Sequence, residues 1–258
     1  PRFASMGQTA PAIEGLAYDG RGREFWAVTA DGWLIRFDSS KSEVARGRVS
    51  GAPSPITGLA FDPSRRELLG ICSASGLLVR IEPETLVATP RGVGQGGSVD
   101  AIDFDPVSRT LYGLDDAVGG TRLVVIDIDS GERTVVGTLG AEVTDCNGLA
   151  FSPMDGFLYS VHAPDGRVLR IDPATGSAVS LGVGNGMWDS SVGLAVEAPL
   201  PVCDADVNFS GAPDSDDVVL FFGWWDAGDR AADVTGDRST DSDDVVAFFQ
   251  SWETGCPE

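Results

Sequence analysis

The chain has 258 residues and a formal net charge of −21 at pH 7. A surface this acidic repels phosphate backbones and anionic bilayers, which excludes nucleic acids and membrane surfaces as natural partners and favours cations and basic surfaces. No apolar run approaches the roughly 18 residues that cross a bilayer, so no membrane-spanning segment is expected.

Residues 1–198 are expected to form a repeat domain, because one short apolar segment recurs along them. The first copy, Gly15–Asp19, reads Gly-Leu-Ala-Tyr-Asp, and later copies are Gly58–Asp62, Ala101–Asp105, Gly148–Ser152 and Gly193–Val196. Successive copies start 43, 43, 47 and 45 residues apart. A period of about 40 to 50 residues indicates a repeat architecture.

Three further short segments follow each of the first four copies. They are rich in β-branched and aromatic residues and are bounded by Asp-Gly, Asp-Pro or Gly-Gly turns, which is typical of β-strands. The second segments lie at 25–28, 68–71, 111–114 and 158–161, the third at 33–38, 78–82, 123–127 and 168–172, and the fourth near 44–50, 87–94, 133–139 and 178–184. Four strands per repeat predict an all-β propeller with four full blades, because a β-sandwich would not keep this internal register.

The fifth copy, Gly193–Val196, is followed by no second or third strand, whereas Arg2–Gly7 reads as an unpaired fourth strand. Propellers often close by building one blade from both ends of the chain, because an unpaired blade edge invites aggregation. We therefore expect a partial, composite fifth blade with its middle strands upstream of Pro1. The sequence, which has neither an initiator Met nor a signal peptide, would then be a processed form or a fragment.

The repeats resemble a loose class of secreted bacterial propellers whose units read Gly-Leu-Ala-Phe-Asp-Pro, Leu-Tyr-Gly and Ile-Asp-Pro-x-Thr-Gly. Phe61–Pro63 and Ile171–Gly176 carry this resemblance best. The motifs are structural, so the resemblance implies a fold and brings no active site with it.

A polar residue precedes the core of most first strands, and first strands line the central channel of a propeller. These residues are Glu14, Thr57, Asp100 and Asn147. They are candidates for a ring at one channel mouth that holds a metal ion or a sugar hydroxyl. The alternative is that they only hydrogen-bond neighbouring turns.

Catalytic groups are not obvious in the repeats. His162 is the only histidine, which excludes a multi-histidine metal site, and no Gly-x-Ser-x-Gly elbow accompanies it. Carboxylate pairs for glycoside hydrolysis stay open as an alternative, although no pair stands out by position. Trp26, Trp33 and Trp188 either stack on a sugar or pack between blades.

After a linker at 199–202, residues 203–258 form an acidic module that carries −12 of the net charge. One twelve-residue pattern occurs twice in it, starting at Asp206 and at Asp233, with side-chain oxygens at loop positions 1, 3, 5, 9 and 12. Such a loop wraps a calcium ion, which takes about six to eight oxygens. Two Ca²⁺ sites are expected, and the predicted ligands, loop position 7 included, are Asp206, Asn208, Ser210, Ala212, Asp214, Asp217, Asp233, Thr235, Asp237, Ser239, Asp241 and Asp244.

The same apolar segment follows each loop, as Val218–Phe222 and Val245–Phe249. Cys203 and Cys256 bracket the module, which suggests a disulfide clasp between its ends and hence an oxidising compartment. The alternative is that both are free buried cysteines.

The two loops with their helical segments resemble a type I dockerin domain, in particular the divergent form that ends surface and secreted proteins of some environmental bacteria. In dockerins, loop positions 10 and 11 help select the cohesin partner, and here the same pair occupies them twice, as Ser215-Asp216 and Ser242-Asp243. The resemblance implies a small α-helical calcium-binding domain that binds a cohesin-like or cell-envelope protein. The chain departs from the dockerin pattern at Ser210 and Arg238 and lacks the basic residues that usually follow in the helices.

These features predict a secreted or cell-surface, non-enzymatic binding or scaffold protein. The propeller would present a ligand or partner surface, with a glycan as a candidate ligand, and the calcium-dependent module would attach it. The rival hypothesis is a carbohydrate-active hydrolase or lyase, or a lactonase, on the propeller, and a third is a structural surface-layer component. An enzyme would need a long catalytic loop, whereas the longest insertion, near Asp115–Gly120, has only a few residues.

Overall fold

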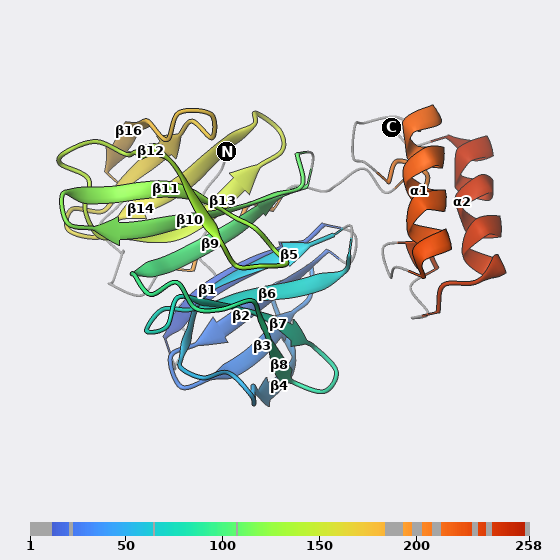
Figure 1. Ribbon diagram of the computed structural model, residues 1–258, viewed down its shortest axis with the longest axis horizontal. Coiled ribbons are helices and arrows are strands. Elements are labelled where there is room, and N and C mark those ends of the chain that lie inside the picture. Colours follow the sequence, from blue (N-terminus) through green and yellow to red (C-terminus); the bar gives the residue numbers. More distant parts are fainter. Residues whose placement is uncertain are drawn as a thin grey trace.

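A computed structural model describes residues 12–20, 23–63, 65–106, 108–183, 193–197, 203–207, 213–228, 232–235 and 239–255. Within these residues the chain forms sixteen β-strands in four separate four-stranded sheets, followed by two α-helices (Figure 1). Neither of these helices is long and apolar enough to span a membrane.

The four sheets are the blades of a propeller and follow one another along the chain. Blade 1 contains β1 (Ile13–Asp19), β2 (Glu24–Thr29), β3 (Trp33–Phe37) and β4 (Glu43–Arg48), and blade 2 contains β5 (Ile56–Asp62), β6 (Glu67–Cys72), β7 (Leu77–Glu82) and β8 (Val87–Arg91). Blade 3 contains β9 (Val99–Asp105), β10 (Thr110–Ala117), β11 (Gly120–Ile126) and β12 (Arg133–Thr138), and blade 4 contains β13 (Cys146–Ser152), β14 (Phe157–His162), β15 (Arg167–Ile171) and β16 (Ala178–Val183). Each blade is an antiparallel meander, because its short turns leave no room for a crossover. The predicted fold, a propeller followed by a small helical domain, is confirmed.

The first strands of the blades lie side by side around the channel, β1 against β5, β5 against β9 and β9 against β13. The repeated segment begins with glycine in blades 1 and 2 because the first strand of the next blade lies too close for a side chain. A Cβ on Gly15 would lie 2.7 Å from the Leu59 nitrogen, and one on Gly58 would lie 2.9 Å from the Ile102 nitrogen. The Gly-Leu-Ala signature of the repeat therefore reflects the close approach of neighbouring blades.

Segment 193–197 lies beside β1, where a fifth first strand would stand. A Cβ on Gly193 would lie 2.8 Å from the Leu16 Cβ, and Glu197 forms an ion pair with Lys41 at 2.9 Å. The segment is not a β-strand, and no described strand pairs with it. Of the predicted composite fifth blade, the structure therefore describes only the segment expected to be its first strand. The expected fourth strand, Arg2–Gly7, lies outside the described residues.

Apolar side chains fill the spaces between neighbouring blades and form three shared cores. Burial decreases outward within each blade: every residue of β6 is buried, whereas β4 and β16 at the blade edges are largely exposed. Each blade is therefore stabilised mainly by its neighbours, as expected for a repeat architecture.

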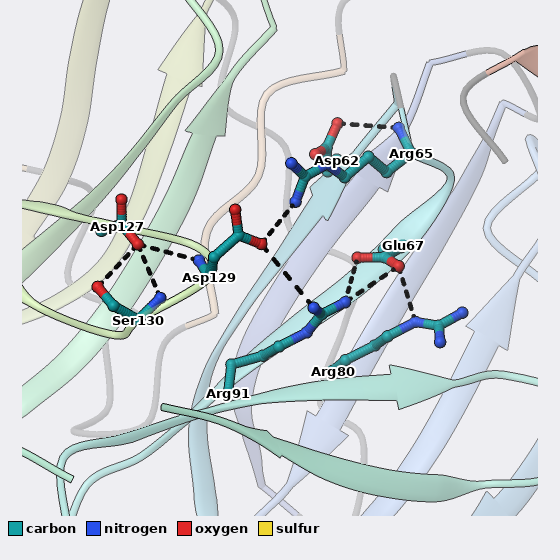
Figure 2. Close-up of polar contacts among 8 residues, drawn as sticks. All are labelled: Asp62, Arg65, Glu67, Arg80, Arg91, Asp127, Asp129 and Ser130. Atoms are coloured by element: carbon teal, nitrogen blue, oxygen red, sulfur yellow. Dashed lines mark hydrogen bonds and ion pairs between the residues drawn. The ribbon is translucent and has the colours of Figure 1, made fainter. Parts of the chain in front are cut away.

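An ion-pair network joins blade 2 to blade 3 (Figure 2). Glu67, whose side chain is 9% exposed, pairs with Arg80 at 2.9 Å and with Arg91 at 3.3 Å. Asp129, in the turn before β12, pairs with Arg65 at 3.3 Å and with Arg91 at 3.9 Å. Because these charges neutralise one another, we interpret the network as a structural link between blades.

The tail contains α1 (Ser215–Ala227) and α2 (Ser242–Thr254), which begin in the same way. Asp214 caps α1 and Asp241 caps α2 through bonds to the first-turn amides, and Asp217 and Asp244 each accept a bond from the amide of their cap residue. These reciprocal capping boxes explain why both helices start at the end of a predicted calcium loop.

The two helices pack about an approximate two-fold axis. Phe221 and Phe248, which are 27 positions apart, stack with ring centroids 4.3 Å apart, and Phe222 and Phe249 lie 6.2 Å apart. Contacts between equivalent residues of two copies form close to such an axis. The other buried apolar residues of this core are Cys203, Ala205, Val207, Trp224, Ala232 and Val234.

The four cysteines divide between the two parts of the chain. Cys203 is disulfide-bonded, whereas Cys72 and Cys146 are free and buried in the propeller. Cys256, the expected partner of Cys203, lies outside the described residues.

Candidate functional site

The second predicted calcium loop brings three ligand residues together at the start of α2. Asp233 and Asp244 are buried, and the Thr235 hydroxyl lies 3.4 Å from Asp233 Oδ1 and 3.0 Å from Asp244 Oδ1. The Thr235 amide also donates to Asp244 Oδ1 at 3.0 Å. Loop positions 1, 3 and 12 therefore converge, as a calcium loop requires.

Asp241, at position 9 of the same loop, is kept ionised by its neighbours. Hydrogen bonds from the Ser239 hydroxyl and the Asp243 amide hold the pKa of Asp241 below its ordinary value. The carboxylate form is the one that coordinates a hard cation.

The first loop repeats this arrangement in its described part. Asp206 and Asp217, at positions 1 and 12, are 1% and 0% exposed, and Asp214 caps the following helix as Asp241 does. The predicted ligands Asn208, Ser210 and Ala212, and Asp237 of the second loop, lie outside the described residues.

The chemistry of this donor set fits calcium, because every predicted ligand that the structure describes offers a side-chain oxygen. Within the described part of the chain, no three Asp, Glu, His or Cys side chains gather closely enough to hold a metal. The described carboxylates alone therefore do not make a complete site, and an ion would also need donors from the rest of the two loops.

The predicted recognition residues are at the helix starts. Ser215–Asp216 begins α1 and Ser242–Asp243 begins α2, and all four residues are exposed. Val219 and Val246, one turn further along, are 74% and 53% exposed. Residues three or four apart share a helix face, so each helix presents a serine, an acid and a valine to solvent.

At one end of the propeller channel, the structure brings together two of the predicted mouth residues. Burial raises the pKa of Glu14. Burial also raises the pKa of Asp100, and the negative charges of Asp116, Asp145, Asp115 and Glu14 raise it further. The Thr57 hydroxyl is buried without a hydrogen-bond partner among the described residues. The acids near Asp100 thus come mainly from β10 and the loop before β13.

At this end, glycine and apolar residues of the first strands line a small hollow beside Glu14, among them Gly15, Leu16, Gly58 and Leu59. The space left there is about 10 Å³, close to the ~10–15 Å³ that one water needs.

The opposite end holds a carboxyl group that sequence reasoning missed. Asp103 stands where the other copies of the repeat have Ala17, Ala60, Ala150 and Ala195. Its Oδ2 accepts a hydrogen bond from the Phe151 amide at 2.6 Å, and its side chain lines a hollow of about 50 Å³. Burial raises the pKa of Asp103 to about 7. The replacement of this repeated alanine by an acid in one copy of the repeat is the sequence signal that could have revealed Asp103.

The histidine and its neighbours do not form an activated nucleophile. His162 ends β14 opposite Cys146, and its Nδ1 lies 2.6 Å from Asp165 Oδ1. Burial raises the pKa of Cys146 to about 12. The sulfur is therefore a thiol at neutral pH, whereas nucleophilic catalysis needs the thiolate.

The described tryptophans of the propeller are covered by arginines. The guanidinium carbon of Arg36 lies 5.7 Å from the Trp26 ring centre, and that of Arg46 lies 5.9 Å from the Trp33 ring centre. These stacked arginines compete with a sugar for the rings, while Trp188 lies outside the described residues.

Comparisons with known proteins support the propeller. No protein-family model matches the chain, and no curated protein matches it. A chain in the crystal structure of a nidogen/laminin complex has a TM-score of 0.53 and 19% identity, over 67% of this chain and 65% of that one. Regucalcin, a calcium-binding protein from Agrobacterium tumefaciens, has a TM-score of 0.47 and 19% identity, over 68% and 61% of the two chains. Virginiamycin B lyase from Staphylococcus aureus has a TM-score of 0.46 and 11% identity, over 68% and 57%.

At these identities the likeness shows the fold alone, and it rests on the nidogen/laminin structure, since the other two scores are too low to add to it. The chain spans 65% of the length of that chain, so the match leaves about a third of it uncovered.

Proposed function

We propose that the protein is a secreted or cell-surface binding or scaffold protein without catalytic activity. The propeller presents a ligand or partner surface, with a glycan as a candidate ligand. The dockerin-like tail binds two Ca²⁺ ions and attaches the propeller to a cohesin-like or cell-envelope protein. The disulfide at Cys203 supports a location outside the cytosol, because disulfides persist in oxidising compartments.

The convergence of Asp233, Thr235 and Asp244 is the observation that carries this proposal. These residues come from the two ends of one loop, so an ion held between them would tie the loop to the start of α2. The unfolded chain has no such site, and the affinity for calcium therefore adds to the free energy of folding of the tail.

Calcium titration of the whole chain by calorimetry tests the proposal. Asp206→Asn and Asp233→Asn each remove one negative ligand from one loop, and we expect each to weaken one site by about tenfold or more. Asp226→Asn is the matched control, because it removes the same charge from an exposed residue of α1 outside the loops. No saturable uptake at millimolar calcium, or equal affinities in all three variants, would contradict the proposal.

The duplicated surface at the helix starts supports a protein partner. The nidogen/laminin structure is a precedent for a propeller in a protein–protein complex. Binding to a panel of cohesin domains tests the tail directly. If either helix can present the recognition face, replacing Ser215–Asp216 or Ser242–Asp243 with alanines leaves binding intact, and replacing both pairs abolishes it. Undiminished binding by the doubly altered chain would exclude this face.

The rival proposal, a carbohydrate-active hydrolase or lyase or a lactonase on the propeller, is favoured by one observation. The raised pKa of Asp103 suits a general acid or base at neutral pH. However, the hollow beside it, about 50 Å³, is far smaller than the ~300 Å³ of an ordinary substrate pocket. Turnover of polysaccharides or lactones that is lost in Asp103→Asn would replace the binding proposal with the enzyme.

A further inference from the structure

The hollow beside Asp103 is built from equivalent positions of all four blades. Each blade contributes one aromatic residue to its lining, Tyr18, Phe61, Phe104 and Phe151. Pro63, Pro106 and Pro153 also line it, and segment 193–197 adds Ala195 and Val196. The hollow therefore has aromatic and aliphatic walls around the axis of the propeller.

Asp103 gives this apolar hollow a fixed acidic group. Among the described residues that line the hollow, Asp103 is the one acid and none is basic. The hydrogen bond from the Phe151 amide of the next blade holds its carboxyl group in place. A carboxylate surrounded by rings and prolines is costly without an opposite charge nearby, and a cation from solution would supply that charge.

We propose that this end of the channel binds the head group of a small organic cation, a primary or N-methylated ammonium, with Asp103 as its counter-ion. Ammonium groups are attracted to aromatic rings within about 6 Å. A space of about 50 Å³ suits a compact head group and excludes a sugar ring. The net charge of −21 further raises the concentration of cations near the surface.

This inference deepens the ligand-presenting role proposed for the propeller and does not depend on calcium in the tail. If the hollow binds no cation, the propeller could still present another ligand, and the calcium titration would be unaffected. The two failures are therefore distinguishable.

The affinity should follow the ionisation of one carboxyl group. Burial, together with the charge of Asp105 on the same strand, raises the pKa of Asp103 to about 7. Tyr18 of β1 is a phenol whose pKa burial raises, and the residues that β5, β13 and their turns contribute to the lining carry no charge. Because a group with a pKa near 7 is about tenfold less ionised at pH 6 than at pH 8, binding should be about tenfold weaker at pH 6.

Titration of the whole chain with tetramethylammonium chloride, followed by the amide resonance of Phe151, tests the proposal. A saturable shift is expected, with an affinity that rises about tenfold from pH 6 to pH 8. The neutral molecule tert-butanol, of similar shape, should bind at least tenfold more weakly if charge matters.

Two variants separate the counter-ion from the structural role of Asp103. Asp103→Asn keeps an acceptor for the Phe151 amide, and Asp103→Ala restores the residue of the other repeats. Both should lose at least tenfold in affinity and all of the pH dependence. No saturable shift up to about 10 mM ligand, equal binding of tert-butanol, or unchanged binding by the variants would each overturn the proposal.

Discussion

Three arginines adopt a backbone conformation that favours glycine. Arg23, Arg66 and Arg109 end the turn between the first and second strands of blades 1 to 3, with φ angles of 52°, 52° and 55°. Gly156 fills the same place in blade 4, with φ of 72°. This left-handed conformation costs a residue with a Cβ roughly 1–2 kcal/mol.

Arg66→Gly is therefore expected to stabilise the propeller. Arg66 is exposed, so its replacement removes no buried contact. Glycine relieves the backbone strain but also raises the conformational entropy of the unfolded chain, so the free energy of unfolding should increase by about 1 kcal/mol. A gain of this size raises the melting temperature by roughly 2–4 °C in a chain of this length. Arg48→Gly in the exposed strand β4 is the matched control and should lower it, so a fall in both variants would contradict the explanation.

Asp103 should make stability depend on pH. Its pKa is raised from 3.8 to about 7, so the folded state disfavours the ionised form that the unfolded chain readily adopts. Below about pH 4 the group is protonated in both states and has no effect, and stability then falls as the pH rises toward 7. The loss is at most about 4 kcal/mol, and less because the side chain is partly exposed to solvent.

Thermal denaturation at pH 4.5 and at pH 8 measures this loss for the parent chain and Asp103→Asn. The variant should melt close to the parent at the lower pH and clearly above it at the higher pH. Parallel pH profiles would show that the carboxyl group is not disfavoured in the fold.

At the scale of elements, the stack of Phe221 on Phe248 holds the two helices of the tail together. Both rings are fully buried, and replacing either with alanine should cost about 3–5 kcal/mol. Phe249, which is 39% exposed, should cost about 1 kcal/mol or less when replaced in the same way. Calorimetry of the calcium-loaded chain should show the tail transition moving in Phe221→Ala and Phe248→Ala but little in Phe249→Ala. Equal shifts in the three variants would contradict the symmetric core.

The strands were predictable from sequence because each is a short apolar segment between turn residues. The residues at which the strands end were harder to predict. The fourth strand expected at 87–94 ends at Arg91, because Gly92 follows with φ of 66°. The insertion expected near 115–120 instead lengthens the β10–β11 hairpin, in which Asp115 pairs with Arg122 and Ala117 with Gly120. Whether extra residues form a loop or extend a ladder depends on pairing that local sequence does not reveal.

The candidate sites also differ in how far the sequence alone could predict them. The calcium loops stay a prediction, and the sequence suffices to make it because the proposed ligands of each loop lie within twelve residues of one another. The sequence singles out Asp103 by its place in the repeat, but its surroundings could not be predicted, because its hydrogen-bond partner Phe151 lies 48 positions away in the next blade. The neighbours that raise the pKa of Asp100 likewise come from another strand and another blade. A site whose residues come from different blades can be recognised only from the three-dimensional structure.

At the scale of the whole molecule, the two parts should unfold separately. A cation–π contact joins them, with the Arg109 guanidinium carbon 4.8 Å from the Trp224 ring centre. Such a contact contributes about 0.5–2 kcal/mol, whereas a domain is stabilised by about 5–15 kcal/mol. The contact is therefore too weak to make the stability of one part depend on that of the other.

Chelation of calcium should consequently unfold the tail and leave the propeller intact. The tail carries −12 of the net charge, and without a bound cation its clustered carboxylates repel one another. With EDTA, protease should cut within residues 203–258, while the propeller transition in calorimetry stays in place, and Arg109→Ala should not alter this pattern. Equal protease resistance of the tail with and without calcium would mean that its disulfide and apolar core suffice. A propeller transition that moves with EDTA would mean that the two parts are coupled, because an ion bound only in the tail can stabilise the propeller only through contacts between them.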